Sequence, residues 1–400
     1  MHSLGSSIPL FCVLLLACGD DGGATGGTDG GTGGTDGGTD GGTGGTDGGT
    51  GGSTGLIAEP FAVAVQGERL LVAGGYEGDA FVARFFVDGR IDASFGVDGI
   101  RRVDFGGPET PFRRQEDVAY ALLVRPNAIV IAGAVRGLVP GAGVFGLARL
   151  TGDGALDETF GNGGIRITDT GDDNSSRWNQ IFADDAGRLY AVGGLYNGVS
   201  RGQDIVVARY SADGPIDVDF RTPGSTGAGV IWDGGSQEEW GIAGALLADG
   251  VVAGGGPAGF RVTKFDLSGA LVPSFGTGGV FRDEGGVLFA IRPQEDGGLL
   301  LIGTAPPPAD GEPTNGFKLV RLDVDGALVP SFGEGGRLIV RWDLTLIEFP
   351  DGQTLSGGFN TVRGVAFAPD GDVLVHSAIL GITPVVARID PATGAAVDSF

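Results

Sequence analysis

The sequence predicts an all-β fold, a β-propeller of about six four-stranded blades preceded by a disordered Gly/Thr/Asp tether. Two observations carry this prediction. A basic residue precedes a Phe by eleven residues in five places and by twelve in a sixth, with a repeat period of 55–68 residues. Each repeat also holds four short apolar segments separated by Gly- and Asp-rich turns, without helical periodicity. Six such sheets would stack radially, which protects strand edges.

The repeated pairs give every unit a common frame. The basic members are Arg84, Arg149, Arg209, Lys264, Arg321 and Arg388, and the aromatic members are Phe95, Phe160, Phe220, Phe275, Phe332 and Phe400. A position fixed in every repeat serves a need that every repeat shares. We therefore predict that the basic side chain lies along apolar surface or hydrogen-bonds a turn, and that the Phe fills the core between sheets. A ring of ligand-binding charges is the alternative for the basic set.

The amino end predicts export. Residues 1–17 contain the apolar run Ile8–Ala17, which is too short to span a bilayer and is typical of a signal peptide. The run ends in Leu15-Leu16-Ala17-Cys18, which resembles the lipobox of bacterial lipoproteins, although no Lys or Arg precedes it. The resemblance implies lipidation of Cys18, a membrane partner through that lipid, and an extracytoplasmic location at the bacterial outer membrane or cell surface. An ordinary secretory signal is the alternative.

Residues 18–55 predict a linker. Twenty of residues 19–55 are Gly, and the rest are chiefly Thr and Asp. Such a tract has no apolar surface to offset the entropy of ordering, so we expect a flexible spacer. The only two Cys are Cys12 and Cys18, so no disulfide is expected in the folded part.

Residues 56–400 predict the six-repeat propeller domain. In the first unit the expected strands are Phe61–Val65, Leu70–Gly75, Phe81–Val87 and Ile100–Phe105. The turn Asp88-Gly89 suits the positive φ of a tight turn. The later second segments are Ile129–Ala134, Leu189–Gly194, Val251–Gly255, Leu299–Thr304 and Val373–Ala378. The later third segments are Phe145–Leu150, Ile205–Tyr210, Phe260–Phe265, Phe317–Leu322 and Val385–Ile389.

Two features of these units bear on how blades assemble. Small residues at the end of the second segment are expected to let neighbouring sheets approach closely near a central channel. The sixth unit reaches Phe400 before any fourth segment. Either Leu56–Ala58 supplies that strand and joins the two ends of the domain, or the last sheet has three strands.

The repeated pattern resembles the delta-60 repeat family. In unit one the matching residues are Ala83-Arg84, Asp88-Gly89, Asp92, Phe95-Gly96 and Gly99, and in unit two they are Ala148-Arg149, Asp153-Gly154, Asp157, Phe160-Gly161 and Gly164. Three units depart from the pattern, with Val272-Pro273 and Val329-Pro330 at the Asp position and Arg221 after Phe220. The resemblance implies an extracytoplasmic propeller-like repeat domain and no particular chemistry.

Candidate chemistry is sparse. The turn around Asp153 and Asp157, and the segment Gly171–Asn174, resemble pieces of calcium loops without the full ligand spacing, so no cofactor is predicted and Ca²⁺ is kept as the one open candidate. His376, the only His after the signal, lies in an apolar segment and is expected to be structural. The formal net charge of −24 argues against a nucleic-acid partner.

The connections that vary in length predict a binding face. In an up-and-down sheet the second-to-third and fourth-to-first connections lie on one rim, where binding evolves in repeat proteins. The candidate residues of that face are Trp178, Trp232, Trp240, Asn315 and Trp342. Loops that drift neutrally are the alternative interpretation.

Two functional hypotheses follow. The first is a monomeric, non-catalytic envelope lipoprotein that binds a protein, peptide or glycan through the long-loop face. The alternative is a propeller-type hydrolase or lactonase that uses an acid-lined channel and a divalent cation. The lack of His clusters and of unit-specific polar motifs favours the non-enzymatic hypothesis.

Overall fold

The computed structural model describes the chain between residues 58 and 390, with gaps. The described ranges are 58–106, 116–139, 142–169, 176–196, 203–223, 230–232, 241–256, 259–306, 316–341, 347–348, 354–355, 362–367, 373–379 and 383–390. All regular structure in these ranges is β-strand. No helix in them is long and apolar enough to cross a bilayer. The predicted signal peptide, the lipobox and the linker lie outside the described residues.

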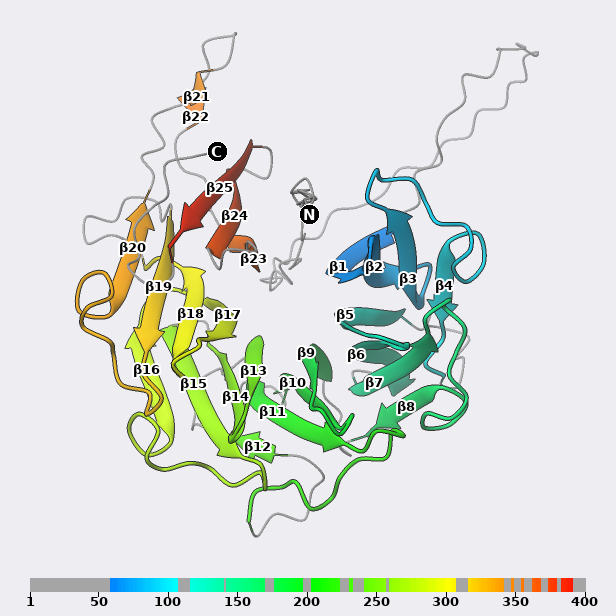
Figure 1. Ribbon diagram of the computed structural model, residues 1–400, viewed down its shortest axis with the longest axis horizontal. Helices are drawn as coiled ribbons and strands as arrows, with labels where there is room; N and C mark the ends of the chain where they lie inside the picture. Colours follow the sequence, from blue (N-terminus) through cyan, green and yellow to red (C-terminus); the bar gives the residue numbers. More distant parts are fainter. Residues whose placement is uncertain are drawn as a thin grey trace, which may run out of the picture.

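Five blades each contain four antiparallel strands joined in chain order (Figure 1). Blade 1 holds β1 (Ala58–Gln66), β2 (Arg69–Tyr76), β3 (Asp79–Phe86) and β4 (Ile100–Val103). Blade 2 holds β5 (Glu116–Arg125), β6 (Ala128–Val139), β7 (Ala142–Thr151) and β8 (Ile165–Thr168). Blade 3 holds β9 (Ser176–Ala183), β10 (Leu189–Tyr196), β11 (Gln203–Tyr210) and β12 (Val230–Trp232). Blade 4 holds β13 (Ala243–Leu247), β14 (Gly250–Gly255), β15 (Gly259–Asp266) and β16 (Val280–Glu284), and blade 5 holds β17 (Leu288–Pro293), β18 (Leu299–Thr304), β19 (Gly316–Leu322) and β20 (Arg337–Arg341).

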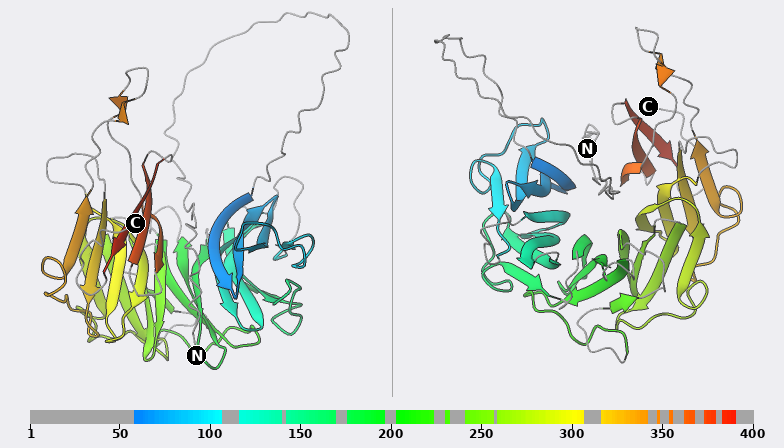
Figure 2. Two further views of the ribbon diagram at one scale, coloured as in Figure 1. Left: turned by 45° about the horizontal axis from the view of Figure 1, so that its top comes forward. Right: turned by 180° about the vertical axis from the view of Figure 1, so that it is seen from behind.

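The blades are arranged radially. The first strand of each blade lies innermost and the fourth lies outermost (Figures 1 and 2). The innermost strands of successive blades contact one another in the order β1, β5, β9, β13, β17 and then β23 (Val362–Phe367). This arrangement confirms the predicted all-β propeller architecture.

The core lies between blades. One cluster joins Leu71 and Val82 of blade 1 to Ile131 of blade 2, and further clusters join each later blade to its neighbour. A sheet that lies between two other blades is covered on both faces. Every residue of strands such as β18 and β19 is therefore buried. That burial explains why their sequences are continuous apolar runs instead of alternating ones.

Blade 6 has three described strands, β23, β24 (Val373–Ile379) and β25 (Thr383–Ile389), beside a separate hairpin of β21 (Ile347–Glu348) and β22 (Thr354–Leu355). Ala58 does not supply a fourth strand, because it belongs to β1 and pairs with Tyr76 of its own blade. That part of the closure hypothesis is therefore wrong. Leu56 and Ile57 lie outside the described residues.

Candidate functional site

The repeated basic residues join neighbouring blades. Arg84 Nε lies 3.0 Å from Asp92 Oδ2, and its guanidinium stacks 4.8 Å from the centre of the Phe95 ring. Arg84 Nη1 also donates to the carbonyl of Gly152 in blade 2, at 2.7 Å. The backbone N–H of Gly96 donates to the adjacent carbonyl of Asp153, at 2.8 Å. We call this pair of bonds, from the arginine and from the residue after the Phe to the next blade's third-to-fourth turn, the blade clasp.

The clasp recurs. Arg149 donates to the carbonyl of Ala212 and Arg209 to that of Leu267, each in the next blade. The backbone bonds of blades 2, 3 and 4 run from Gly161 to Asp213 (2.7 Å), from Arg221 to Ser268 (3.2 Å) and from Gly276 to Asp325 (2.7 Å). Arg221 keeps its bond because only its backbone takes part, so the departure from Gly at this position changes little.

In blades 4 and 5 the repeated basic residue bonds within its own blade, and its acidic partner differs from that of blades 1 to 3. Val272 and Val329 stand where the other blades carry Asp92, Asp157 or Asp217. Lys264 pairs instead with Asp249, at 2.8 Å, and Arg321 with Asp296, at 2.5 Å. Both substitute carboxylates come from the turn between the first and second strands of the same blade. The repeated cation therefore has an acidic partner in each of blades 1 to 5.

The remaining repeat residues have simple placements. Phe95, Phe160, Phe220, Phe275 and Phe332 are buried in the core. Arg388 lies half-buried in β25. Phe400 lies outside the described residues. The structure thus places the described basic residues in contacts between or within blades.

The acidic turns serve these same contacts. Hydrogen bonds from Ser94 and then Arg69 lower the pKa of Asp92 to about 2, although burial opposes them. Asp157 accepts from Thr159 and Arg149, and the hydrogen bond from Thr159 is the main cause of its lowered pKa. The residues described hold no group of three or more His, Cys, Asp or Glu that suits a metal, so we derive no cation-dependent step. The segment 171–174 lies outside them.

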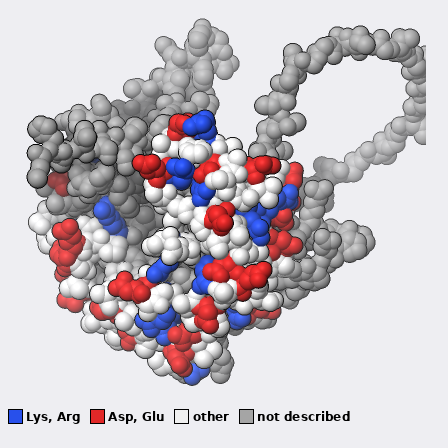
Figure 3. Space-filling model, turned by 45° about the vertical axis from the view of Figure 1, so that its right-hand side comes forward, with Lys and Arg blue, Asp and Glu red and all other residues white. Residues whose placement is uncertain are grey.

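The surface charges are mixed. Figure 3, which brings the right-hand side of Figure 1 forward, shows acidic and basic side chains side by side. Exposed ion pairs contribute to this pattern, for example Arg102 with Glu77 and Asp79, and Arg90 with Asp88.

Trp178 corrects the predicted binding face. It lies in β9, is 1% exposed, and stacks on Phe145 with ring centres 3.9 Å apart. Trp178 is therefore a core residue. The prediction was wrong because the fourth-to-first connection ends before Ser176, so Trp178 already lies in the innermost strand. Trp232 ends the outermost strand β12, of which the structure describes the backbone. Trp240, Asn315 and Trp342 lie outside the described residues, and so does the side chain of His376.

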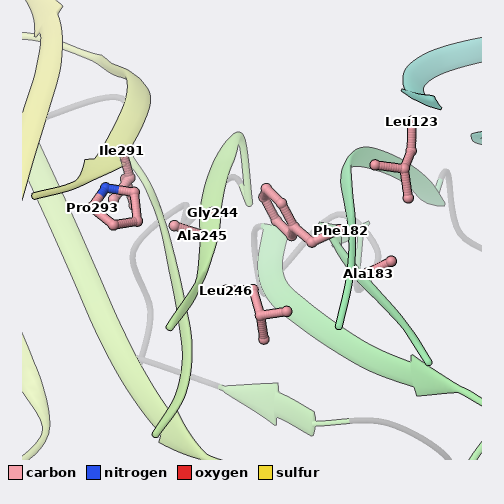
Figure 4. Close-up of a pocket in the computed structure, with 8 residues that line it drawn as sticks. All are labelled: Leu123, Phe182, Ala183, Gly244, Ala245, Leu246, Ile291 and Pro293. Atoms are coloured by element: carbon pink, nitrogen blue, oxygen red, sulfur yellow. The ribbon is translucent and has the colours of Figure 1, made fainter. Parts of the chain in front are cut away.

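A cavity occupies the centre of the ring. Its volume is about 340 Å³, and its lining comes from the innermost strands of blades 2 to 5 (Figure 4). The lining residues are Leu123, Phe182, Ala183, Gly244, Ala245, Leu246, Ile291 and Pro293. All eight are apolar or lack a side chain, so the expectation of an acid-lined channel is wrong for this cavity.

The innermost strands also contain β-bulges, which the sequence did not predict. Four of them carry a one-residue bulge at matching places, and the extra residues are Phe61, Tyr120, Asn179 and Phe289. In β23 the backbone has the same bulge at Arg363. In the described part of blade 4, the pairing of β13 with β14 is regular. Bulges occur often beside active sites, where they redirect a side chain.

The bulges explain the small residues that end the second strands. Gly74, Gly133, Gly193 and Gly303 lie opposite them. A Cβ on Gly133 would lie 1.8 Å from the carbonyl oxygen of Val118, on the blade's own first strand. The glycines therefore make room for the bulge within a blade, and the expected approach of neighbouring sheets is a secondary effect. This Gly was the available sequence signal for the bulge.

Comparison with known proteins supports the fold. The family model described as a domain of unknown function (DUF5122) beta-propeller matches residues 127–160. No curated protein matches the chain. Three solved structures illustrate the likeness. The GH43 endo-arabinanase from Bacillus licheniformis has a TM-score of 0.35 and 13% identity, with 69% of this chain and 95% of that chain covered.

The other two are larger or less completely covered. Polysaccharide lyase Uly1 has a TM-score of 0.39 and 12% identity, covering 82% of this chain and 80% of that chain. Prolyl oligopeptidase B from Galerina marginata has a TM-score of 0.42 and 11% identity, covering 84% of this chain and 40% of that chain. Likenesses this distant show the fold alone, and the reactions named for these proteins remain theirs.

The comparison nevertheless corrects the first functional hypothesis. The matching structures include arabinanases, a polysaccharide lyase and a prolyl oligopeptidase. This finding contradicts the prediction of a non-catalytic envelope binding module, which we report as wrong. The alternative, a propeller-type hydrolase, is the better supported hypothesis.

Proposed function

We propose that the protein is a propeller-type hydrolase of esters or lactones, with its substrate held in the central channel. The cavity carries this proposal. It lies where the innermost strands of four blades converge, and its 340 Å³ falls near the lower end of the range for small-molecule sites. A concave apolar site of this kind is the default place for a substrate.

The lining specifies which part of a substrate the cavity takes. The side chains at these eight positions offer no partner for a charge or a hydroxyl, so a charged group placed there would lose much of its hydration without a side chain to compensate. An alkyl or acyl chain suits the lining. Since no lining side chain can activate water, the cleaved bond is proposed to lie at the channel mouth, above the cavity.

Filling the cavity tests the proposal. Ala183 is half-buried, lines the cavity and ends β9. In Ala183→Trp, we expect the KM for p-nitrophenyl octanoate to rise at least roughly tenfold, because each methylene excluded from the pocket forfeits about 0.8 kcal/mol. The KM for p-nitrophenyl acetate should change little. Steady-state kinetics on the full-length protein measures both.

The matched control is Val324→Trp, a Trp on an exposed turn of blade 5 where the native side chain is 49% exposed. It should leave both KM values unchanged. If the wild-type protein hydrolyses no ester or lactone, the proposed function is wrong.

The location of the protein is a separate proposal, which rests on the sequence of residues 1–18. We propose that Cys18 is lipidated after cleavage at Ala17. Metabolic labelling with palmitate should mark the wild type but not Cys18→Ala, and Cys12→Ala should still be labelled. An unlabelled wild type would favour the ordinary secretory signal, and equal labelling of wild type and Cys18→Ala would contradict Cys18 as the lipidated residue.

A further inference from the structure

We propose that the bulged residues Phe61, Tyr120, Asn179 and Phe289 form a recognition ring for a neutral cyclic group of the substrate. The inference deepens the proposed function, since it assigns the specificity of the same channel. It adds residues that the cavity does not include and a chemistry that the cavity cannot supply.

The first step concerns the backbone. The bulge recurs at matching places with a glycine opposite, but the residue that it presents changes from Phe to Tyr to Asn. The blade clasp differs from the bulges in this respect, because the same residue types recur at the same positions of the repeat. A constant backbone device that presents variable side chains is what a recognition surface requires.

The second step concerns accessibility. An innermost strand pairs with the second strand on one side only. Neighbouring blades contact both faces of β5, β9 and β17, so the exposed part of a half-buried side chain there opens on the channel, and Phe289 also packs against the core between blades 5 and 6. Among the other blades, β1 makes substantial contact with blade 2 alone, in the contacts of the described residues. Phe61, Tyr120, Asn179 and Phe289 are all half-buried. Figure 1 shows their strands β1, β5, β9 and β17 around the centre.

Contacts between blades connect the ring. The rings of Phe61 and Tyr120 lie 4.7 Å apart at 52° across the boundary of blades 1 and 2. The Arg177 guanidinium of blade 3 lies 4.9 Å from the Tyr120 ring centre. Asn179 Nδ2 donates to the carbonyl of Gly241, which precedes blade 4, at 2.7 Å. These contacts fix the positions of Tyr120 and Asn179.

The chemistry of the ring indicates its ligand. Aromatic faces favour flat or cyclic apolar surfaces. The Asn179 amide donates one N–H to Gly241, and its second N–H can donate a hydrogen bond to a carbonyl of the ligand. These four side chains carry no charge, and the side chain at the fifth bulge, Arg363, lies outside the described residues. Along β5 and β9, three residues separate Tyr120 from Leu123 and Asn179 from Phe182, a rise of about 10 Å. A neutral ring with an alkyl tail would therefore place its ring against the bulges and its tail in the cavity.

A pair of non-hydrolysable ketones tests the inference. The probes are 2-pentylcyclopentanone and 2-decanone, which are both neutral, have ten carbons each and differ in the ring. Isothermal titration calorimetry on the full-length protein should give tighter binding of the cyclic ketone by roughly tenfold. In Tyr120→Leu, this cyclic preference should fall roughly three- to tenfold, which corresponds to the loss of one ring contact. Asn179→Ala should instead weaken the binding of both ketones roughly three- to tenfold, which corresponds to the loss of one hydrogen bond.

The matched control is Tyr76→Leu. Tyr76 is also a half-buried tyrosine with an arginine over its ring, Arg102 at 5.2 Å, but it lies in β2. It should keep the cyclic preference, and all variants should melt near the wild-type temperature. Equal or absent binding of the two ketones by the wild type, an unchanged preference in Tyr120→Leu, or unchanged affinity for both ketones in Asn179→Ala would overturn the inference. Selective binding without turnover of any ester or lactone would instead overturn only the proposed function.

Discussion

Single side chains hold one blade to the next. Arg84 joins an acid of its own blade, the face of Phe95 and a carbonyl of blade 2. Hydrogen bonds that involve a charged group contribute more than neutral ones, and a partly buried position shields them from water. The spacing of Arg and Phe indicated that this unit was structural. It did not indicate that Lys264 and Arg321 would find Asp249 and Asp296 instead, because those acids are distant in sequence and meet the cation only in the folded blade.

Removing one clasp should weaken the whole domain. In Arg149→Ala, the loss of the bonds to Asp157, Thr159 and Ala212 is expected to lower the free energy of unfolding by about 1–3 kcal/mol. Urea denaturation measures the change. Arg90→Ala is the control, because Arg90 is 75% exposed in its pair with Asp88 and should cost less than about 0.5 kcal/mol. Equal losses in the two variants would contradict the clasp.

Strands were the most predictable elements and their irregularities the least. The third segments of the repeats form β3, β7, β11, β15, β19 and β25. Short runs of Val, Ile and Leu between Gly-rich turns favour buried strands over helices. The bulges in β1 and β5 gave no such signal of their own. Their trace in the sequence is a glycine on the neighbouring strand, such as Gly133, which by itself could equally mark a close approach between sheets.

Substituting that glycine should be costly. In Gly133→Ala, a Cβ would lie 1.8 Å from the carbonyl oxygen of Val118, so β5 or β6 must shift. We expect the free energy of unfolding to fall by roughly 2–4 kcal/mol, as measured by urea denaturation. Gly152→Ala is the matched control, because its Cβ would meet only the end of the Gln66 side chain, at 3.8 Å. A similar small loss in both variants would mean that the bulge relaxes easily.

The whole molecule is a row of blades with unlike ends. Blade 1 begins the row with four strands, while blade 6 has three described strands, of which β23 contacts β17 and β18 of blade 5 (Figure 2). The sequence predicted the number of blades, because each repeat is one sheet. How the ends meet was open, since no local pattern specifies a contact between segments hundreds of residues apart. The cavity was equally hidden, because its lining comes from four separate repeats.

The third strand of the last sheet should exchange its amide hydrogens faster than the third strand of blade 5. In the described part of the chain, β25 pairs only with β24, whereas β19 pairs on both sides. Strands with one partner open more easily. Hydrogen exchange followed by mass spectrometry should therefore show faster exchange over 383–389 than over 316–322. Equal protection would show that another segment covers the outer edge of β25.

The clasps all point in one direction along the chain, and this polarity sets a schedule for synthesis. Arg84 must wait for the carbonyl of Gly152, which is 68 residues downstream. At translation speeds of about 5–20 residues per second, that partner leaves the ribosome several seconds later. Each of the first four blades is therefore completed by its successor, and a chain that emerges in order carries one unfinished blade while these four form. A pause between repeats would prolong the exposure of one Phe-bearing face and of no other.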